Sequence, residues 1–350
     1  MKEAVIFGVL NWGLGHATRS IPIIQSLQRL NYQVVICSDG DALVLLQKEF
    51  PLSTFEALPP YKVRYDHNSM LINIGRYGLG LLKTIYLEEQ LLNSLVEKYS
   101  PAHIISDNRY GFHHPKVKSV IITHQLHIPT VYSWQGKMAS HFLGHYIEKF
   151  DECWIPDVSE KYNLCGKLAH DVTLSIPIHY IGYLSRLIKQ DLPLKYDIAF
   201  ILSGPEPQRT ILEDLLLQQI QNTDASYILV RGTAAVDNNN STTDNLAVVD
   251  LADSVSLSSI ISQSGMVLSR AGYTTIMDLV AMRKPAILIP TPGQPEQEYL
   301  AEHLSDLFAS FIFVKQADLD LSKLNIKKKE WVDRCIFRSW SDEKLAELLD

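Results

Sequence analysis

The strongest chemical pattern in the sequence lies in residues 268–279, LSRAGYTTIMDL. A short apolar run ends there in a glycine turn that leads directly into a helical pattern. Glycine lets a ligand approach the backbone, and a helix N-terminus offers unpaired N–H groups and the positive end of the helix dipole. We therefore predict a diphosphate cradle in this segment. Its candidate residues are Arg270, Ala271, Gly272, Tyr273, Thr274 and Thr275.

The helical pattern after this turn also carries an acid. Asp278 lies within the first turns, where a carboxylate could accept hydrogen bonds from both hydroxyls of a ribose. Taken alone, the segment is more typical of a well-capped helix with a stabilising acid near its start. Two further segments with related patterns favour the interpretation as a nucleotide site.

Both of these segments place polar groups where an apolar run ends. Residues 201–210, ILSGPEPQRT, again read as strand, glycine turn and helix, although a simple strand–helix connection would look alike. Residues 289–304 begin with a Pro/Gly loop whose amide and carboxylate groups suit pyranose hydroxyls, although such a loop can merely start a helix. The candidate ligands are Ser203, Gly204 and Arg209 in the first segment and Gln294, Glu296 and Gln297 in the second.

A different glycine pattern opens the chain, in NWGLGHATR at residues 11–19. Gly13 and Gly15 resemble the start of a dinucleotide fingerprint, and Asp39 ends the next apolar run, where a ribose-binding acid would lie. Thr18 occupies the third glycine position, which weakens the alternative of an NAD-dependent dehydrogenase.

His16 follows the second of these glycines at the predicted start of a helix. A histidine there could take a proton from an attacking hydroxyl, or it could only hydrogen-bond its own turn. Asp107 ends the apolar run HIISD and is the candidate partner, because a carboxylate orients the ring and stabilises its cation. Asp107 could equally cap the element that follows.

Metal binding is not predicted for the histidines of the first half. Their spacing fits no standard metal motif, and we expect no bound metal. These residues are His103, His113, His114, His124 and His127.

The elements that must position these residues are short apolar runs alternating with helical patterns, which predicts parallel α/β sheets. In the first half the predicted strands are 4–10, 33–39, 103–107, 119–124 and 130–134, with a helix at 17–30. In the second half they are 197–204, 226–232, 246–252, 265–270 and 285–290. Residues 77–92 predict an amphipathic helix that could be core, acceptor-facing or membrane-facing, and 236–245 predict a solvated loop.

Two such series, joined once, predict two doubly wound domains whose ligands bind at the carboxyl ends of the strands. We expect an N-terminal domain at 1–183, a linker at 184–196 and a C-terminal domain at 197–335. The remaining residues, 336–350, form a predicted helix that could pack back on the N-terminal domain.

The composition limits the partners. The 350 residues are 46% hydrophobic and 20% charged, which is ordinary for globular proteins, and a net charge of −7 argues against nucleic-acid binding. The four cysteines have no paired spacing and fit a reducing compartment. The first apolar run predicts a strand rather than a signal peptide, and no stretch approaches the ~20 apolar residues of a membrane span. We expect a cytoplasmic protein, with peripheral membrane association left open.

The donor-type segments resemble the GT-B glycosyltransferases, and most closely glycosyltransferase family 28. That family carries a Ser-Arg-Ala-Gly turn, a threonine and a helical acid that binds ribose. The matching residues are Ser269, Arg270, Ala271, Gly272, Thr275 and Asp278, with Asp where Glu is usual. The likeness covers most of the chain and is specific mainly at 197–304.

Other likenesses assign further residues. Gln297 matches a glutamine that contacts the donor sugar, and the stretch 180–186 looks like the family's hinge, which implies that Arg186 lies near the donor phosphates. Ser203-Gly204 resembles a diphosphate turn, with Pro205 and Pro207 replacing its second glycine-rich part.

On the acceptor side, Gly15-His16 matches a Gly-His pair that faces the acceptor in GT-B enzymes, and Asp107 is placed like the acid of plant-type His–Asp pairs. His124 and Gln125 resemble an acceptor-site pair of relatives.

The resemblance implies two Rossmann-like domains facing across a cleft and an inverting, metal-independent glycosyltransferase. It would move a hexose or N-acetylhexosamine from a UDP-sugar, a co-substrate rather than a tightly bound cofactor, to a saccharide, glycolipid or lipid-linked acceptor. A UDP-sugar 2-epimerase of the same fold and a non-catalytic nucleotide-sugar-binding subunit remain alternatives.

Overall fold

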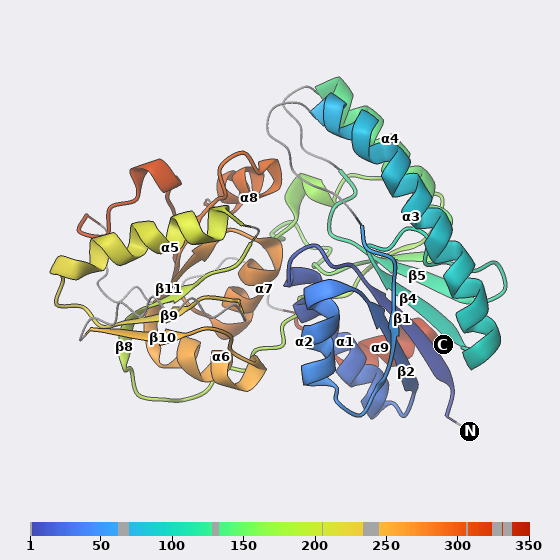
Figure 1. Cartoon of the computed structure of the whole chain (residues 1–350), viewed down its shortest axis with the longest axis horizontal. Coiled ribbons are helices and arrows are strands. Elements are labelled where there is room, and N and C mark those ends of the chain that lie inside the picture. The colour runs from blue at the N-terminus through green and yellow to red at the C-terminus, as the bar shows by residue number, and fades with distance from the viewer. Residues whose placement is uncertain are drawn as a thin grey trace. The chain divides into compact units, whose positions relative to one another are not determined.

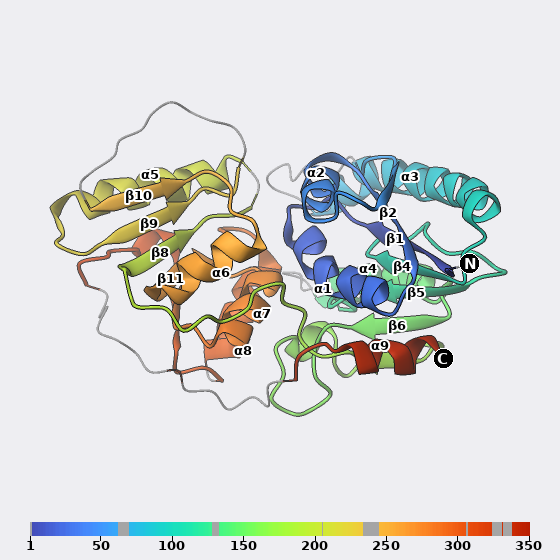
Figure 2. The ribbon, with the colours of Figure 1, turned by 90° about the horizontal axis from the view of Figure 1, so that it is seen from below.

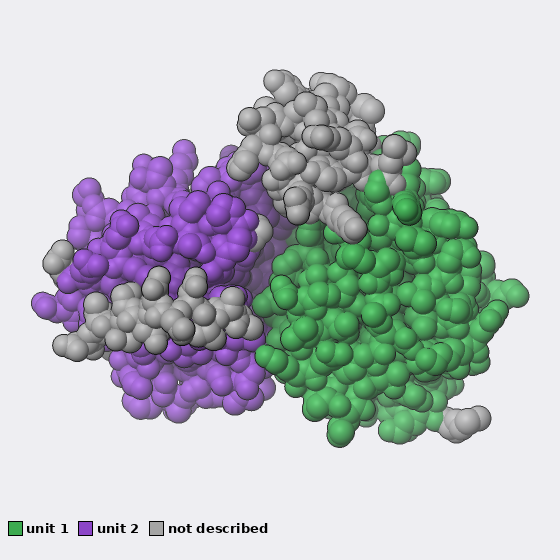
Figure 3. Space-filling view, viewed as in Figure 1, with its two compact units in different colours: residues 1–158, 167–182, 340–350 green, residues 159–166, 183–339 purple. Residues whose placement is uncertain are grey.

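The computed structural model describes most of the chain, namely residues 2–61, 70–127, 133–204, 206–233, 245–305, 307–323, 331 and 338–350. The loop predicted at 236–245 lies outside these residues, apart from Asn245. The chain forms two compact units, which Figure 3 colours separately. Unit 1 consists of 1–158, 167–182 and 340–350, and unit 2 consists of 159–166 and 183–339.

Unit 1 is built on a seven-stranded sheet in which all paired strands are parallel. Its strands are β1 (Ala4–Val9), β2 (Gln33–Ser38), β3 (Thr54–Ala57), β4 (His103–Asp107), β5 (Lys118–Ile122), β6 (Glu152–Ile155) and β7 (Ile178–Tyr180). They lie in the order β3-β2-β1-β4-β5-β6-β7. The order therefore reverses between β1 and β4, which makes this pair the topological switch point of the sheet.

Helices cover this sheet, and Figure 1 labels them. They are α1 (Gly15–Arg29), α2 (Gly40–Glu49), α3 (Met70–Tyr99), α4 (Ser133–Ile147) and α9 (Asp342–Leu349). Leu92 and Leu95 of α3 pack on Ile6 of β1, Val35 of β2 and Ile104 of β4 in one buried cluster. The predicted helix at 77–92 is thus part of α3, and the described part of this helix contributes to the core.

The end of the chain packs within unit 1. Helix α9 contacts α1, and the Trp340 Nε1–H donates to the Ser26 hydroxyl at 2.8 Å. Trp340 also lies against Trp154 of β6, with 6.3 Å between the ring centroids, and Figure 2 shows α9 in red beside this strand.

Unit 2 contains a second parallel sheet, of six strands. Its strands are β8 (Tyr196–Ile201), β9 (Tyr227–Val230), β10 (Leu246–Val249), β11 (Ser264–Arg270), β12 (Ala286–Ile289) and β13 (Phe311–Phe313). They lie in the order β10-β9-β8-β11-β12-β13, so the switch point is between β8 and β11.

The helices of unit 2 are α5 (Gln208–Gln219), α6 (Ser254–Ser262), α7 (Tyr273–Met282) and α8 (Pro295–Ser305). Figures 1 and 2 show α5 on the opposite side of the sheet from α6 and α7. Three short 3-10 helices complete the described elements: Gly166–Leu168, Ile220–Asn222 and Gln316–Asp318. The two doubly wound domains predicted from the alternating pattern are confirmed.

Two details differ from the sequence-based expectations. The strand predicted at 130–134 is wrong in its described part, because Ser133 and Trp134 begin helix α4. Residues 184–196, expected as a linker, belong to unit 2. The N–H groups of Ile188 and Gln190 donate to serine hydroxyls of α6, which holds this segment against the helix.

Candidate functional site

The carboxyl ends of β1 and β4 carry the polar cluster of unit 1. Gly13 lies in the loop after β1 with φ of +69°, a left-handed conformation that glycine adopts without strain. Helix α1 begins two residues later, so His16 lies in its first turn. Asp107 is the last residue of β4. The doubly wound fold therefore brings these two predicted residues together at the switch point of the sheet.

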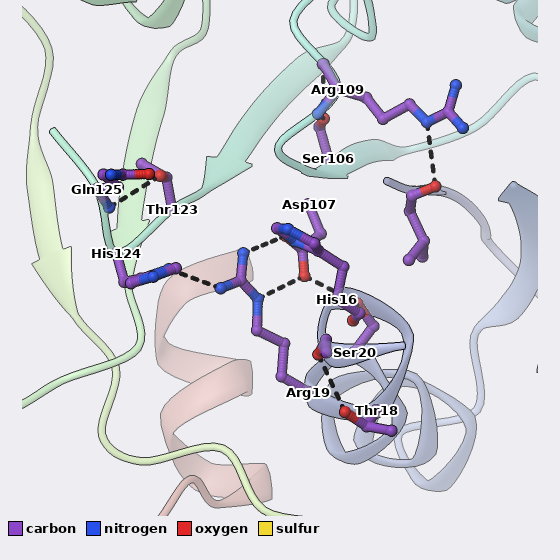
Figure 4. Close-up of polar contacts among 12 residues, drawn as sticks. His16, Thr18, Arg19, Ser20, Ser106, Asp107, Arg109, Thr123, His124 and Gln125 are labelled. Atoms are coloured by element: carbon purple, nitrogen blue, oxygen red, sulfur yellow. Dashed lines mark hydrogen bonds and ion pairs between the residues drawn. The ribbon is translucent and has the colours of Figure 1, made fainter. Parts of the chain in front are cut away.

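Asp107 is completely buried and accepts hydrogen bonds from three side chains of α1 (Figure 4). His16 Nδ1 lies 2.8 Å from Oδ1, and the Ser20 hydroxyl donates to Oδ2 at 3.1 Å. The Arg19 guanidinium forms a fork on the carboxylate, with Nε 2.7 Å from Oδ2 and Nη2 on Oδ1. The predicted His16–Asp107 contact exists, but it belongs to a larger charged cluster.

The cluster sets the charge of Asp107. Burial raises the pKa of this carboxyl, but the charge of Arg19 and the hydrogen bonds from Arg19 and His16 outweigh burial and hold it well below its usual range. For His16, burial and the charge of Arg19 lower the pKa, although Asp107 acts in the opposite direction. The geometry therefore presents a neutral imidazole, oriented by an ionised carboxylate, in a side chain that is 13% exposed.

The predicted acceptor residues follow the next strand. His124 is buried two residues after β5, and its Nδ1 lies 2.8 Å from Nη1 of Arg19. Gln125 is half-buried, and its N–H donates to the Thr123 hydroxyl. The structure thus brings His124 into the same cluster as His16 through Arg19, whereas the Gln125 N–H contacts its near neighbour Thr123.

A second buried network lies under the loops after β2 and β4. Arg109 is fully buried, and its guanidinium donates to Asp39 and to Glu88. Asn11 donates to the other oxygen of Asp39, and Tyr61 donates to Glu88 at 2.6 Å. Asp39 is therefore engaged within the protein on both oxygens, and this counts against its role as the ribose-binding acid of a dinucleotide site.

In unit 2, the switch point carries the predicted donor residues. Ser203 and Gly204 follow β8 and are exposed, and the φ of +101° at Gly204 requires glycine. Arg270 ends β11, and helix α7 begins at Tyr273 after Ala271, with Gly272 as its N-cap and no side-chain cap. Glycine has no side chain, so Gly272 itself cannot cap the first-turn N–H groups of α7.

The buried side chain of Arg270 is satisfied in its hydrogen bonding only in part. It is 2% exposed, its Nη2 donates to the Gln208 carbonyl at 2.6 Å, and its buried Nη1 has no hydrogen-bond partner among the described residues. Burial lowers the pKa of the guanidinium to about 10. A buried cation without a counter-charge is costly, so the site is suited to receive an anion.

Gly272 lies beside this arginine, and neither its backbone conformation nor its packing within the protein requires a glycine. Its φ of −74° is ordinary, and an added Cβ would meet only Thr275 Oγ1, at 3.8 Å. The space over the helix N-terminus is thus free of protein atoms at this position. Thr274 and Thr275 are half-buried in the same turn, while Tyr273 is buried and its hydroxyl accepts from Cys165 at 3.0 Å.

Asp278 lies one turn further along α7 and is half-buried. Burial raises the pKa of its carboxyl to about 6, while the Ser185 hydroxyl and the charge of Arg186 act in the opposite direction. The Ser185 hydroxyl donates to Oδ1 at 2.6 Å. Arg186 Nη1 donates to Ser254 at 3.2 Å, so the segment after β7 supplies groups to this side of unit 2.

The other predicted donor residues mostly contact neighbours of their own segment. Gln297 is buried, accepts from the Thr291 N–H at 2.8 Å and donates to Gln294 at 2.8 Å, which braces the Pro/Gly loop after β12. Glu296 is half-buried in the first turn of α8. Arg209 of α5 forms ion pairs with Glu206, which precedes the helix, and with Glu213 of α5.

Sequence reasoning missed Arg19, Ser20, Ser185 and the network of Arg109. A usable signal existed for two of them, because residues three and four positions after His16 lie on the same face of a helix. Arg109 and Ser185 carry no such signal, since their partners lie 70 and 93 positions away in the sequence. Within the described part of the chain, no group of three or more His, Cys, Asp or Glu is arranged to hold a metal ion.

Comparisons with known proteins place this geometry among glycosyltransferases. Residues 207–333 match the family model described as the glycosyltransferase family 28 C-terminal domain. An 89-residue segment is 30% identical to a UDP-N-acetylglucosamine–N-acetylmuramyl-(pentapeptide) pyrophosphoryl-undecaprenol N-acetylglucosamine transferase of Caldicellulosiruptor saccharolyticus. That segment covers 25% of this chain and 23% of the relative.

Solved structures share the architecture of the whole chain. The glycosyltransferase SnogD from Streptomyces nogalater has a TM-score of 0.59 and 15% identity, over 92% of this chain and 89% of its own. MurG of Acinetobacter baumannii has a TM-score of 0.53 and 12% identity, over 91% and 87%. These likenesses, with the two parallel sheets, confirm the predicted GT-B fold.

Proposed function

We propose that this GT-B protein, whose second unit contains a match to the family 28 C-terminal domain, is a glycosyltransferase that uses a UDP-sugar. One observation supports the proposal: in each unit, the polar residues singled out from the sequence lie at the switch point of the sheet. The half in unit 2 suits a nucleoside diphosphate, and the half in unit 1 suits the removal of a proton from a hydroxyl.

The donor half rests on Arg270, Gly272 and Asp278. The N-terminus of α7 and the buried Nη1 of Arg270 provide donors and positive charge for the diphosphate. Gly272 leaves room for its approach, and Asp278 would accept from the ribose hydroxyls. The family usually carries the longer Glu at this position, so Asp278 keeps the carboxylate but departs from the family pattern in side-chain length. Ser203, Gly204, Arg186 and the loop of Gln294 and Gln297 complete the proposed donor site.

The transfer step follows from the tautomer of His16. Because Nδ1 faces the ionised Asp107, it carries the ring proton, and Nε2 keeps the lone pair that can accept a proton. The acceptor oxygen forms a bond to the anomeric carbon from the face opposite the leaving group, and the bond from that carbon to UDP breaks. The hydroxyl proton passes to His16, and the configuration inverts. The N-terminus of α7 and Arg270 stabilise the departing diphosphate.

The acceptor class follows from the relatives rather than from the chain itself. The curated relative's name places its acceptor on undecaprenol, so we propose a saccharide, glycolipid or lipid-linked acceptor for this chain. Within the described residues, no helix is long and apolar enough to span a membrane. Among the described residues, Cys37, Cys153 and Cys165 are buried and form no disulfide, which supports the proposal of a cytoplasmic enzyme. The UDP-sugar serves as co-substrate, with no further cofactor.

Calorimetric titration with UDP and measurement of UDP release from UDP-sugars test this function together. We expect UDP to bind, and Asp278→Ala to weaken binding by about 1.5–3 kcal/mol, the typical cost of losing a charged hydrogen bond. Asp214→Ala, which removes an exposed acid of α5, serves as the control and should bind UDP normally. Free UDP formed with an acceptor distinguishes a transferase from a 2-epimerase or a binding subunit. Absence of UDP binding would reject the proposal.

A further inference from the structure

We propose that Arg19 is a positioning residue that, together with Asp107, holds His16 and His124 of unit 1 in opposite tautomers, so that His16 serves as the base and His124 as an N–H donor. The assignment deepens the proposed function and rests on it for its meaning in catalysis. The tautomers themselves are a property of the protein without substrate. Arg19 was not among the residues that the sequence pattern singled out.

The first step concerns His124. Its Nδ1 lies 2.8 Å from Nη1 of Arg19, inside the protein, where both side chains are buried. A guanidinium has only N–H donors and stays protonated in proteins, so it cannot accept a hydrogen bond. His124 Nδ1 must therefore be the acceptor, and the ring proton lies on Nε2. In this tautomer Nδ1 is occupied, and Nε2 carries a proton instead of a lone pair.

The second step concerns His16, one turn earlier on the same helix. Its Nδ1 lies 2.8 Å from Asp107 Oδ1, and an ionised carboxylate only accepts. His16 Nδ1 must therefore donate, which leaves the lone pair on Nε2. Arg19 forms its fork on the same carboxylate and reaches His124 with its remaining terminal nitrogen. Arg19 thus contacts the ring of His124 directly and is linked to the ring of His16 through Asp107 (Figure 4), and the protons of the two rings lie on opposite nitrogens.

The third step is the charge balance. The charged and titratable groups around His16 are Arg19 from α1, Asp107 from β4 and His124 after β5, and Tyr110 after β4 lies near Arg19 and Asp107. Arg19 and Asp107 neutralise each other in a buried site. An imidazolium at either histidine would add an unbalanced charge beside the guanidinium. Besides burial, the Arg19 charge lowers the pKa of His16, which keeps the base unprotonated near neutral pH.

The direct test is ¹⁵N NMR of histidine-labelled protein without substrate. The shifts of the two ring nitrogens identify the protonated one, and the His16→Asn and His124→Gln variants assign the signals. We expect an Nδ1–H tautomer for His16 and an Nε2–H tautomer for His124. The same tautomer on both rings, or rapid exchange at His124 in the wild-type protein, would overturn the proposal. Since no substrate is added, this outcome is independent of whether sugar transfer is found.

Two variants of Arg19 extend the test. Arg19→Lys keeps a charge but loses the fork, so we expect His124 to lose its single tautomer. Arg19→Gln removes the charge, so the acid limb of kcat/KM for UDP release from UDP-N-acetylglucosamine should move up by about one pH unit. The matched control is Arg29→Gln on the same helix as Arg19, which breaks an exposed ion pair with Asp342 of α9. It should leave the tautomers and the pH profile unchanged. An unshifted acid limb in folded Arg19→Gln would contradict the charge balance.

Discussion

Two aspartates of this chain show how the surroundings of a carboxyl decide its chemistry. Asp107 is buried against Arg19 and His16, and despite burial its pKa lies well below the usual range. Asp278 is desolvated with only Ser185 and the more weakly acting Arg186 to favour its charge, and its pKa rises to about 6. Environments that shift the pKa values of two carboxyl groups in opposite directions are typical of sites in which the two acids have separate roles. Here Asp107 would orient the base, and Asp278 would bind the donor.

The raised pKa of Asp278 predicts that UDP affinity depends on pH. The carboxylate is the better acceptor for ribose hydroxyls, and it becomes protonated as the pH falls through about 6. UDP should therefore bind more weakly at pH 5 than at pH 7.5. Titration calorimetry across this range, with Asp278→Asn as the comparison, measures the effect. If the variant keeps the same pH dependence as the wild type, the effect arises elsewhere.

At the residue scale, the sequence located His16 and Asp107 because glycine turns and strand ends mark the edge of a parallel sheet where ligands bind. It could not show that Arg19 holds the same carboxylate, since an arginine on a helix is usually a solvated residue. Nor could it show that the Gln297 amide hydrogen-bonds to Thr291 and Gln294, because such contacts depend on the conformation of a loop.

At the scale of elements, helix α7 joins the strand end at Arg270 to the acid at Asp278. Strand–turn–helix units of this kind were predictable wherever the apolar run was bounded by glycine or proline. The run at 130–134 misled because its β-branched and aromatic residues resemble a strand, yet Ser133 and Trp134 open a helix. Short apolar runs cannot distinguish the two by periodicity alone.

The open space beside Gly272 at the start of α7 permits a substitution that tests UDP binding separately from folding. Gly272→Ala adds a Cβ whose nearest protein atom is 3.8 Å away, so the free energy of unfolding should change by less than about 0.5 kcal/mol. The same methyl would lie where the diphosphate approaches, and UDP affinity should fall about tenfold or more, which is about 1.4 kcal/mol. Denaturant unfolding and calorimetry give the two quantities.

The control for this variant is Gly144→Ala in α4, where an added Cβ meets no atom within 4 Å. It should preserve UDP affinity and raise the free energy of unfolding by about 0.5–1 kcal/mol, because Ala is favoured over Gly inside a helix. If Gly272→Ala binds UDP as well as Gly144→Ala does, the diphosphate does not lie over the start of α7.

At the scale of the whole molecule, the proposed base belongs to unit 1 and the proposed donor site to unit 2. The chain passes between the units near residues 158, 166, 182 and 339. Gly182, with φ of +84°, lies at one of these passages. The fold of each unit was predictable from its own alternating pattern. The passages were not, because the segment 159–166 belongs to unit 2 although it is flanked by parts of unit 1.

Transfer requires the donor sugar to meet the base, so we predict that donor binding draws the units together. Closure of domains around a substrate commonly excludes water from the reaction. Small-angle scattering with and without saturating UDP-N-acetylglucosamine should show a smaller radius of gyration in the bound state. Superimposable profiles at saturation would count against closure.

The most direct test of the central claim is the rate of UDP release from a panel of UDP-sugars, with saccharide and lipid-linked acceptors, by wild-type protein and His16→Ala. We predict release by the wild type and a decrease of roughly 10²–10⁴ in the variant, the usual contribution of a positioned general base. Asp107→Asn should lose part of this factor, and the double variant should be little worse than His16→Ala, since the pair acts as a unit. UDP affinity should stay nearly unchanged in His16→Ala, because the residues of the proposed donor site belong to unit 2. Equal release by wild type and His16→Ala would contradict the assignment of His16 as the base of a glycosyltransferase.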